Sequence, residues 1–146
     1  MEIKPISWQE ALPLRHQVLW PNEPPAFSKV EGDEDALHYG AFLDGEIVCV
    51  ASIHFSSEFT DAHNKTKNAR LRKFATSQAH QGQGIGSLML KRILTDLKQE
   101  GVSIFWCDAR ETAMGLYERF GMHAEGERFY KGDIPYFRMS KNVENA

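Results

Sequence analysis

The chain has 146 residues, of which 42% are hydrophobic and 25% are charged, with a net charge of −3 at pH 7. These values are typical of one globular domain, which we expect residues 1–146 to form, and they lack the basic excess of a nucleic-acid-binding protein. No apolar run reaches the ~20 residues that span a bilayer, and the N-terminus lacks a secretory signal pattern, so we expect no membrane association.

The first predicted element is a helix within residues 8–20 (WQEALPLRHQVLW), where apolar side chains are separated by polar ones. Pro13 is expected to interrupt or start this helix, because proline lacks the backbone N–H donor. Residues 21–36 contain three prolines and several acidic residues, which predicts a loop.

A hairpin and a further strand follow. Residues 38–55 carry two β-rich runs joined by Asp44-Gly45, and this dipeptide tolerates the positive φ angles of a tight hairpin turn. Residues 56–68 are polar and predict a turn. Residues 69–76 (ARLRKFAT) predict a strand, although their alternation is imperfect.

The second half of the chain alternates helices and strands. A helix is predicted to run to a stop at Gly101, because apolar residues recur at helical spacing at Leu88, Met89, Ile93, Leu94 and Leu97. Residues 102–109 form a short apolar run, typical of a strand covered on both faces. Residues 111–121 predict another helix, and residues 126–141 a second hairpin. This order predicts an α+β (mixed α/β) fold with helices on the faces of a mixed sheet.

Two cysteines, Cys49 and Cys107, each lie inside an apolar run. Buried free thiols are the simpler interpretation, and a disulfide is the alternative. Free thiols suit a reducing compartment, so we expect a cytoplasmic protein.

Residues 80–101 (HQGQGIGSLMLKRILTDLKQEG) place three glycines directly before a helix, and this density marks a close approach of the backbone to another group. A plain strand-to-helix connection needs only one cap. Gly82-Gln83-Gly84 resembles the start of a dinucleotide fingerprint, but Ser87 stands at its third glycine position and the preceding loop is long. A nucleotide-triphosphatase loop is excluded because no Gly-Lys-Ser/Thr is present.

The pattern Gln81-x-x-Gly84-x-Gly86, after a strand and a polar loop, resembles the acetyl-CoA-binding motif of the GNAT N-acetyltransferase superfamily. The N–H groups and the dipole of a helix start favour a negative group there, and small residues give the coenzyme A diphosphate access. The segment from Ala113 through Tyr117 to Gly121-Met122 also looks like the C-terminal signature of the family. Over residues 40–140, the resemblance implies a GNAT-like, mostly antiparallel central sheet with a parallel pair at the cofactor cleft and helices on both faces.

This resemblance implies an N-acetyltransferase that moves an acetyl group from acetyl-CoA to a primary amine by direct transfer in a ternary complex. Acetyl-CoA would be a cosubstrate, and no metal is expected. Backbone N–H groups on the motif strand would stabilise the developing oxyanion. The implied cofactor-binding residues are Phe74, Ala75, Thr76, Gln81, Gly82, Gln83, Gly84, Ile85, Gly86, Ser87 and Ala113.

Tyr117 is the candidate catalytic residue, as the acid that protonates the coenzyme A thiolate, because tyrosine stays protonated at neutral pH. The alternative is a packed aromatic on the apolar face of its helix. The general base stays unassigned, since the motif strand carries no carboxylate where many family members have a glutamate. His54, Glu58 and a water relay are candidates. Arg110 either helps shape the active-site cleft or faces solvent.

The acceptor is expected to be a small-molecule amine rather than a protein, and a homodimer is compatible with the sequence. Arg70 and Arg72 lie on one strand face and Lys73 on the other, so we expect the amine to bear an anionic group, unless both arginines face solvent. One alternative is a non-catalytic acyl-CoA-binding sensor or docking domain of the same fold. Another is a different acyl donor, such as succinyl-CoA.

Overall fold

The computed structural model describes residues 1–59 and 65–143. The chain forms two compact units. Unit 1 comprises Met1–His54 and Leu71–Arg92, and unit 2 comprises Phe55–Arg70 and Ile93–Ala146.

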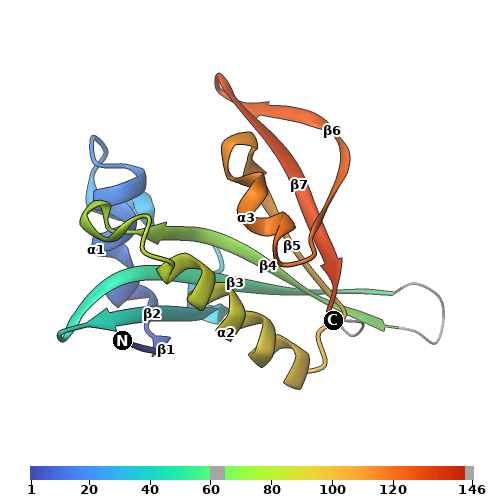
Figure 1. The fold of residues 1–146 in the computed structure, drawn as a ribbon, viewed down its shortest axis with the longest axis horizontal. Coiled ribbons are helices and arrows are strands. Elements are labelled where there is room, and N and C mark those ends of the chain that lie inside the picture. The colour runs from blue at the N-terminus through green and yellow to red at the C-terminus, as the bar shows by residue number, and fades with distance from the viewer. Residues whose placement is uncertain (60–64, 144–146) are drawn as a thin grey trace. The chain divides into compact units, whose positions relative to one another are not determined.

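Within the described residues, the strands hydrogen-bond in the order β1-β2-β3-β4-β5-β7-β6 (Figure 1). The strands are β1 (Glu2–Ile6), β2 (Leu37–Leu43), β3 (Glu46–Phe59), β4 (Lys65–Thr76), β5 (Ile104–Arg110), β6 (His123–Lys131) and β7 (Ile134–Asn142). The α-helices are α1 (Trp8–Leu19), α2 (Ile85–Gln99) and α3 (Met114–Glu118). β4 and β5 are parallel, whereas β1–β2, β2–β3, β5–β7 and β6–β7 are antiparallel. The predicted α+β fold, with a mostly antiparallel sheet and a parallel pair, is confirmed.

Helix α1 of unit 1 fills nearly the whole predicted range of residues 8–20. Ser7 and Glu10 form a capping box, in which the Glu10 N–H donates to Ser7 Oγ and the Ser7 N–H donates to Glu10 Oε1. The helix therefore begins at Trp8, and Pro13 lies inside it. The prediction that Pro13 interrupts or starts the helix was wrong, because its missing N–H removes one bond that the capping box and the buried helix face outweigh.

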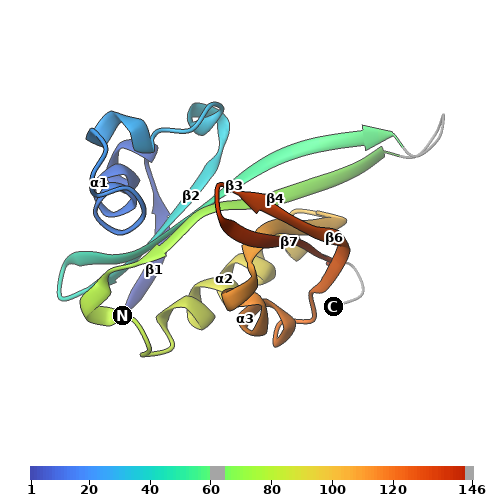
Figure 2. The same ribbon diagram turned by 90° about the horizontal axis from the view of Figure 1, so that it is seen from above.

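The edge strand β1 was not predicted. Its five residues include Pro5, and a proline is tolerated on an edge strand, where the ring does not need to donate to a second neighbour. The Arg92 guanidinium of α2 donates to the Ile3 carbonyl at 2.6 Å, which attaches the strand to this helix. Figure 2 shows α1 and the first half of α2 on opposite faces of the unit 1 strands.

The hairpin of β2 and β3 has the predicted turn. Asp44 has φ of 53° and Gly45 has φ of 82°, so both central residues are left-handed as a type I′ turn requires. The predicted turn at residues 56–68 was too long, because β3 continues to Phe59 and β4 begins at Lys65. Its centre, residues 60–64, lies outside the described residues.

The predicted loop at residues 21–36 contains two short 3₁₀ helices and a buried carboxylate. The Arg15 guanidinium donates from Nη1 to Asp33 Oδ2 at 2.7 Å and from Nη2 to Asp33 Oδ1 at 3.1 Å, and both side chains are 0% exposed. Arg15 also donates to Ser52 Oγ at 2.7 Å and to the Ser28 carbonyl at 3.1 Å. One arginine therefore links α1, the 21–36 segment and β3 inside unit 1.

Helix α2 ends as predicted at Gly101. Gly101 has φ of 75°, its N–H donates to the Lys98 carbonyl, and the Val102 N–H donates to the Leu97 carbonyl at 3.1 Å. These two bonds form a Schellman motif, which satisfies the last carbonyls of the helix. The predicted apolar stripe is correct in part, since Leu88 is 50% exposed, whereas Met89, Leu90, Ile93 and Leu97 are fully buried.

In unit 2, residues 68–70 of β4 pair in parallel with Ile104–Trp106 of β5, and β7 pairs with the other edge of β5. Along β5, Phe105, Cys107 and Ala109 are buried, whereas the alternate residues are half-buried or, at Arg110, exposed. The prediction that both faces of this strand are fully covered was therefore wrong for one face. The hairpin of β6 and β7 is confirmed, with a two-residue turn at Gly132-Asp133 between the paired Lys131 and Ile134.

The helix predicted at residues 111–121 is shorter than expected. Residues 111–113 form a 3₁₀ turn before α3, and Gly121 ends the segment with φ of 84° and a second Schellman pair of bonds. Both cysteines are free and buried, as predicted. No helix in the described part of the chain is long and apolar enough to cross a membrane.

Removing Arg15 should destabilise the protein strongly, because Asp33 would be left buried without its cation. We expect Arg15→Met to lower the free energy of unfolding by about 3–5 kcal/mol in urea denaturation. Glu34→Gln, which removes an exposed ion pair with Lys29, is the control and should leave the unfolding midpoint unchanged. Equal midpoints for Arg15→Met and wild type would contradict this account of the buried pair.

Candidate active site

The predicted cofactor-binding residues fall in both units. Residues 74–76 and 81–87 belong to unit 1, whereas Ala113 and the candidate acid Tyr117 belong to unit 2. Unit 1 thus contains residues 81–86, called the glycine turn below, and the end of β4, and unit 2 contains α3.

The glycine turn of unit 1 requires glycine at two positions for conformational reasons. Gly82 has φ of 78° and Gly84 has φ of 80°, a region that residues with a Cβ rarely adopt. A Cβ at either position would meet no atom within 4 Å, so the turn is open on that side. From the sequence, glycine is expected at this turn for ligand access alone; the left-handed backbone is a second requirement that the structure adds.

Gly86 is glycine for a different reason. A Cβ on this residue would lie 3.2 Å from Cζ of the Phe74 ring, so the first turn of α2 packs closely on β4. The Gln81 side chain stabilises the turn, because its Nε2 donates to the Thr76 carbonyl at 3.0 Å. Gln83 Nε2 makes a longer bond of 3.4 Å to the Ala79 carbonyl. The motif residues thereby hold one another in place.

The backbone N–H groups at the start of α2 are available as hydrogen-bond donors. Its first helical bond runs from the Leu88 N–H to the Gly84 carbonyl, and no backbone carbonyl in the described residues accepts from the N–H groups of residues 82–87. Unpaired N–H groups and the helix dipole make such a helix start attractive to an anion. The donor set and the open glycine positions therefore fit a diphosphate.

The end of β4 contributes three predicted residues with different environments. Phe74 packs on Gly86, Ala75 is buried in a cluster with Ala11 and Leu14 of α1, and Thr76 Oγ1 donates to Cys49 Sγ at 3.4 Å. Before them, Lys73 has φ of 52°, which interrupts the regular alternation of the strand. The side chains of Ala75 and Thr76 therefore contact other residues of unit 1, and a ligand could bind only their backbone groups.

Tyr117 lies in the interior of unit 2, 8% exposed. Its hydroxyl forms a hydrogen bond with the Cys107 thiol of β5, a partner that the sequence did not indicate. Burial, together with the neighbouring thiol, raises the pKa of Tyr117 well above its usual value of 10. Burial and the Asp108 charge raise the pKa of Cys107 to about 12, against the opposing effect of the bond from Tyr117. Both groups are therefore protonated at neutral pH.

Ala113 and Arg110 flank the 3₁₀ turn that precedes α3. Ala113 is half-buried at the start of the helix, and Arg110 is exposed at the end of β5. The exposure of Arg110 agrees with the solvent-facing alternative, although its predicted role at a cleft stays a prediction.

His54 is the candidate base whose surroundings are described. Its Nε2 lies 3.5 Å from Asp33 Oδ1, and its side chain is 15% exposed. Burial and the Arg72 guanidinium lower the pKa of His54 below its usual value of 6.5, against the opposing effect of Asp33. The imidazole is therefore neutral at pH 7. The side chain of Glu58, the other candidate, lies outside the described residues.

Arg70, predicted to face an anionic acceptor, already has an anionic partner. Its Nη2 donates to Asp108 Oδ2 at 3.1 Å within unit 2. The pairing of Arg70 with a carboxylate follows the predicted chemistry, but that carboxylate belongs to the protein.

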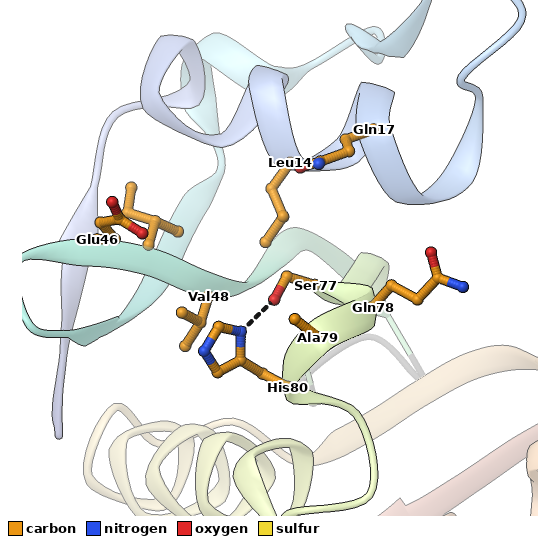
Figure 3. A pocket seen from close by; sticks show the side chains of 9 residues that line it. Leu14, Gln17, Glu46, Val48, Ser77, Gln78, Ala79 and His80 are labelled. Carbon is orange, nitrogen blue, oxygen red and sulfur yellow. Dashed lines mark hydrogen bonds between the residues drawn. The ribbon is translucent and has the colours of Figure 1, made fainter.

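A pocket that the sequence did not indicate lies within unit 1, with a volume of about 600 Å³ (Figure 3). It is bordered by α1, the start of β3 and the 3₁₀ turn at Gln78–His80, and Ser77 Oγ lies 2.6 Å from His80 Nδ1 at its wall. Its lining residues are Leu14, Gln17, Glu46, Ile47, Val48, Ser77, Gln78, Ala79 and His80. In the described residues, no group of three or more His, Cys, Asp or Glu side chains is placed to hold a metal ion.

The strand order, with β4 and β5 parallel among antiparallel neighbours, is an arrangement that other solved proteins share. A solved acyl-CoA N-acyltransferase from Pseudomonas aeruginosa has the same fold, with a TM-score of 0.76 and 19% identity over 96% of this chain and 98% of that one. Residues 3–122 match the Acetyltransferase (GNAT) family, and the chain belongs to this family.

Curated relatives of the chain are also N-acetyltransferases. The uncharacterized N-acetyltransferase YitI of Bacillus subtilis is 33% identical over 137 residues, which cover 92% of this chain and 89% of that protein. The spermine/spermidine N(1)-acetyltransferase of the same organism is 31% identical over 111 residues, which cover 69% of this chain and 71% of that protein. The chain is thus an acyltransferase.

The lowered pKa of His54 should appear in the pH dependence of stability. Below about pH 6.5, His54 is protonated in the unfolded chain but stays neutral in the folded one. Protonation therefore favours the unfolded state, so the free energy of unfolding falls as the pH drops below this value. Urea denaturation between about pH 7.5 and 5.5 should show a shallower loss for His54→Gln than for wild type. His123→Gln, on an exposed position of β6, should keep the wild-type slope. Identical slopes in all three proteins would disprove the assignment.

Proposed function

We propose that the chain is an acetyl-CoA-dependent N-acetyltransferase that transfers acetyl directly to a primary amine, with residues 1–146 acting as one domain. The observation that carries this proposal is the start of α2, where unpaired N–H groups stand beside left-handed glycines with open space around them. When bound, acetyl-CoA supplies an activated thioester. Residues 81–87 would hold its diphosphate, and the backbone of residues 74–76 would lie along its pantetheine arm.

The net reaction moves one acetyl group from sulfur to nitrogen. The amine nitrogen forms a bond to the carbonyl carbon, and the bond between that carbon and sulfur breaks. The nitrogen loses one proton and the departing thiolate gains one. No acyl-enzyme is needed, which agrees with the burial of both cysteine thiols and their raised pKa values.

Tyr117 is proposed as the donor of the proton that the thiolate gains. Its raised pKa keeps the hydroxyl protonated at neutral pH, and in the structure the hydroxyl already hydrogen-bonds a sulfur atom, that of Cys107. The same burial and bond also favour the alternative of a packed aromatic in a non-catalytic, acyl-CoA-binding domain. Turnover with any amine separates the two, because a sensor binds the cofactor without releasing a thiol.

The acceptor is proposed to be a small molecule. The spermine/spermidine relative has small amines as its substrates, and it covers two-thirds of the chain. The cytoplasmic location and the dimer stay predictions.

A charged side chain at Gly84 should abolish coenzyme A binding. Gly84→Glu places bulk and negative charge at the helix start, so calorimetry should detect no binding, and coenzyme A should no longer raise the melting temperature. Gly132→Glu is the matched control, because Gly132 also has a positive φ, 63°, with no atom within 4 Å of its Cβ position. It carries the same strain in the β6–β7 turn and should bind normally. Full affinity in Gly84→Glu would show that the site is wrongly placed.

Tyr117→Phe should lower kcat by roughly 10- to 10⁴-fold if the hydroxyl is the general acid. The ring stays packed, so the affinity for coenzyme A and the fold should change little. The control is Tyr130→Phe, on a side chain of β6 that is 59% exposed, which should keep the wild-type kcat. An unchanged kcat in Tyr117→Phe, with chemistry rate-limiting, would leave Tyr117 as a packing residue.

A further inference from the structure

Asp108 of β5 lies among three cations, all within unit 2. Arg70 Nη2 is 3.1 Å from Asp108 Oδ2, Arg138 Nε is 3.2 Å from Oδ1, and Lys131 Nζ is 3.7 Å from Oδ2. The carboxylate is 8% exposed, whereas the side chains of Lys131 and Arg138 are about half exposed. One carboxylate cannot neutralise three cations, so the cluster keeps a positive charge.

The cluster is held by aromatic rings as well as by Asp108. The guanidinium carbons of Arg70 and Arg138 lie 4.6 and 4.2 Å from the centroid of the Trp106 ring. Lys131 Nζ lies 4.7 Å from the Tyr136 ring, which stacks on Phe129. Cation–π contacts fix long basic side chains that would otherwise move freely, so less entropy is lost when they bind an anion.

Hydrogen-bond donors remain in this cluster. Arg70 Nε is buried with no partner in the described residues, and Arg138 uses Nε for Asp108, which leaves its terminal nitrogens without a bond in that part of the chain. A guanidinium edge with free N–H groups matches a carboxylate, which accepts two parallel bonds.

The strand register identifies the other charges on this face. Arg110 is opposite Tyr136, and Glu125 is opposite Arg138, so both share the face with Asp108. The residues that the register assigns to this face include the cations Arg70, Arg110, Lys131 and Arg138 and the carboxylates Asp108 and Glu125. Cys107, which alternates with Trp106 and Asp108 on β5, points to the other face, where it meets Tyr117. The basic face is therefore the one that α3 does not cover.

We propose that this basic face, formed by Arg70, Trp106, Asp108, Lys131 and Arg138, binds the carboxylate of the acceptor, so that the acceptor is an amino acid or a similar amine that carries a carboxylate. The inference rests on the proposed N-acetyltransferase function and names its substrate class. Arg70 belongs to β4, and residues 74–76 later in the same strand are the ones proposed to bind the pantetheine arm of the acetyl donor. A polyamine would bring like charge to this face.

The test compares each standard amino acid with its own α-carboxamide in a thiol-release assay with acetyl-CoA. The pair differs only in the negative charge, so wild type should prefer the acid in kcat/KM. Arg138→Gln should lower kcat/KM for the acid by about 10- to 100-fold, through KM, and leave the amide within about 2-fold. Arg119→Gln, which removes an exposed arginine at the end of α3, is the matched control and should keep the wild-type preference.

Equal use of acid and amide by wild type would overturn the proposal, as would rapid turnover of spermidine that Arg138→Gln leaves unchanged. A second measurement separates this failure from failure of the proposed function. The indole N–H signal of Trp106 is followed by NMR during titration with N-acetylglycine and with N-acetylglycinamide, in the presence of coenzyme A. Acid-selective binding that Arg138→Gln removes supports the basic face even if no amine is acetylated. No acid-selective binding overturns the proposal, whether or not an amine is acetylated.

Discussion

Unit 1 depends on the buried ion pair of Arg15 and Asp33. Two charged groups with no exposed surface are costly to bury, and they are tolerated because both Asp33 oxygens and both terminal nitrogens of Arg15 are bonded, while Arg15 Nε has no partner among the described residues. Burial alone would raise the pKa of Asp33, but the bonds from Arg15 and from the Val30 N–H outweigh it and hold that pKa below the usual value. The Asp33 carbonyl also lies 2.8 Å from His38 Nε2, whose Nδ1 is 2.7 Å from Ser52 Oγ. This network gives residues 21–36 a fixed course despite their loop-like composition, and it places a carboxylate behind His54.

Local signals in the sequence predicted the elements that depend on local chemistry. Asp44-Gly45, Gly101 and Gly121 each have the left-handed backbone that their positions indicated, because a turn or a helix end imposes it within a few residues. The edge strand β1 and the pair of Arg15 and Asp33 could not be found in this way. Their partners lie 18 residues or more away along the chain, and a short segment with a proline, or one arginine in a helix, carries no mark of its partner.

The candidate site shows the same difference between features set by local sequence and features set by distant contacts. The glycine motif is local and could be identified from residues 81–86, but the left-handed backbone of Gly82 and Gly84 and the packing of Gly86 on Phe74 were not predicted. The surroundings of the side chains could not be anticipated. Tyr117 meets Cys107, Arg70 meets Asp108, and His54 lies beside Asp33, and each of these contacts joins elements separated by a long stretch of chain. Family resemblance therefore indicates which residues matter, while their protonation and partners depend on the tertiary structure.

The two buried thiols have a consequence for how the protein can be observed. Cys49 contacts Thr76 in unit 1 and Cys107 contacts Tyr117 in unit 2, and the two cysteines are at most 2% exposed. Burial, as the largest cause, raises the pKa of Cys49 to about 11, so very little thiolate forms at neutral pH in either unit. An alkylating reagent can then react only with molecules in which one unit has opened locally. Each cysteine is therefore a natural reporter of the opening of its own unit, and the rates at which the two thiols become labelled measure two local stabilities in one undisturbed chain.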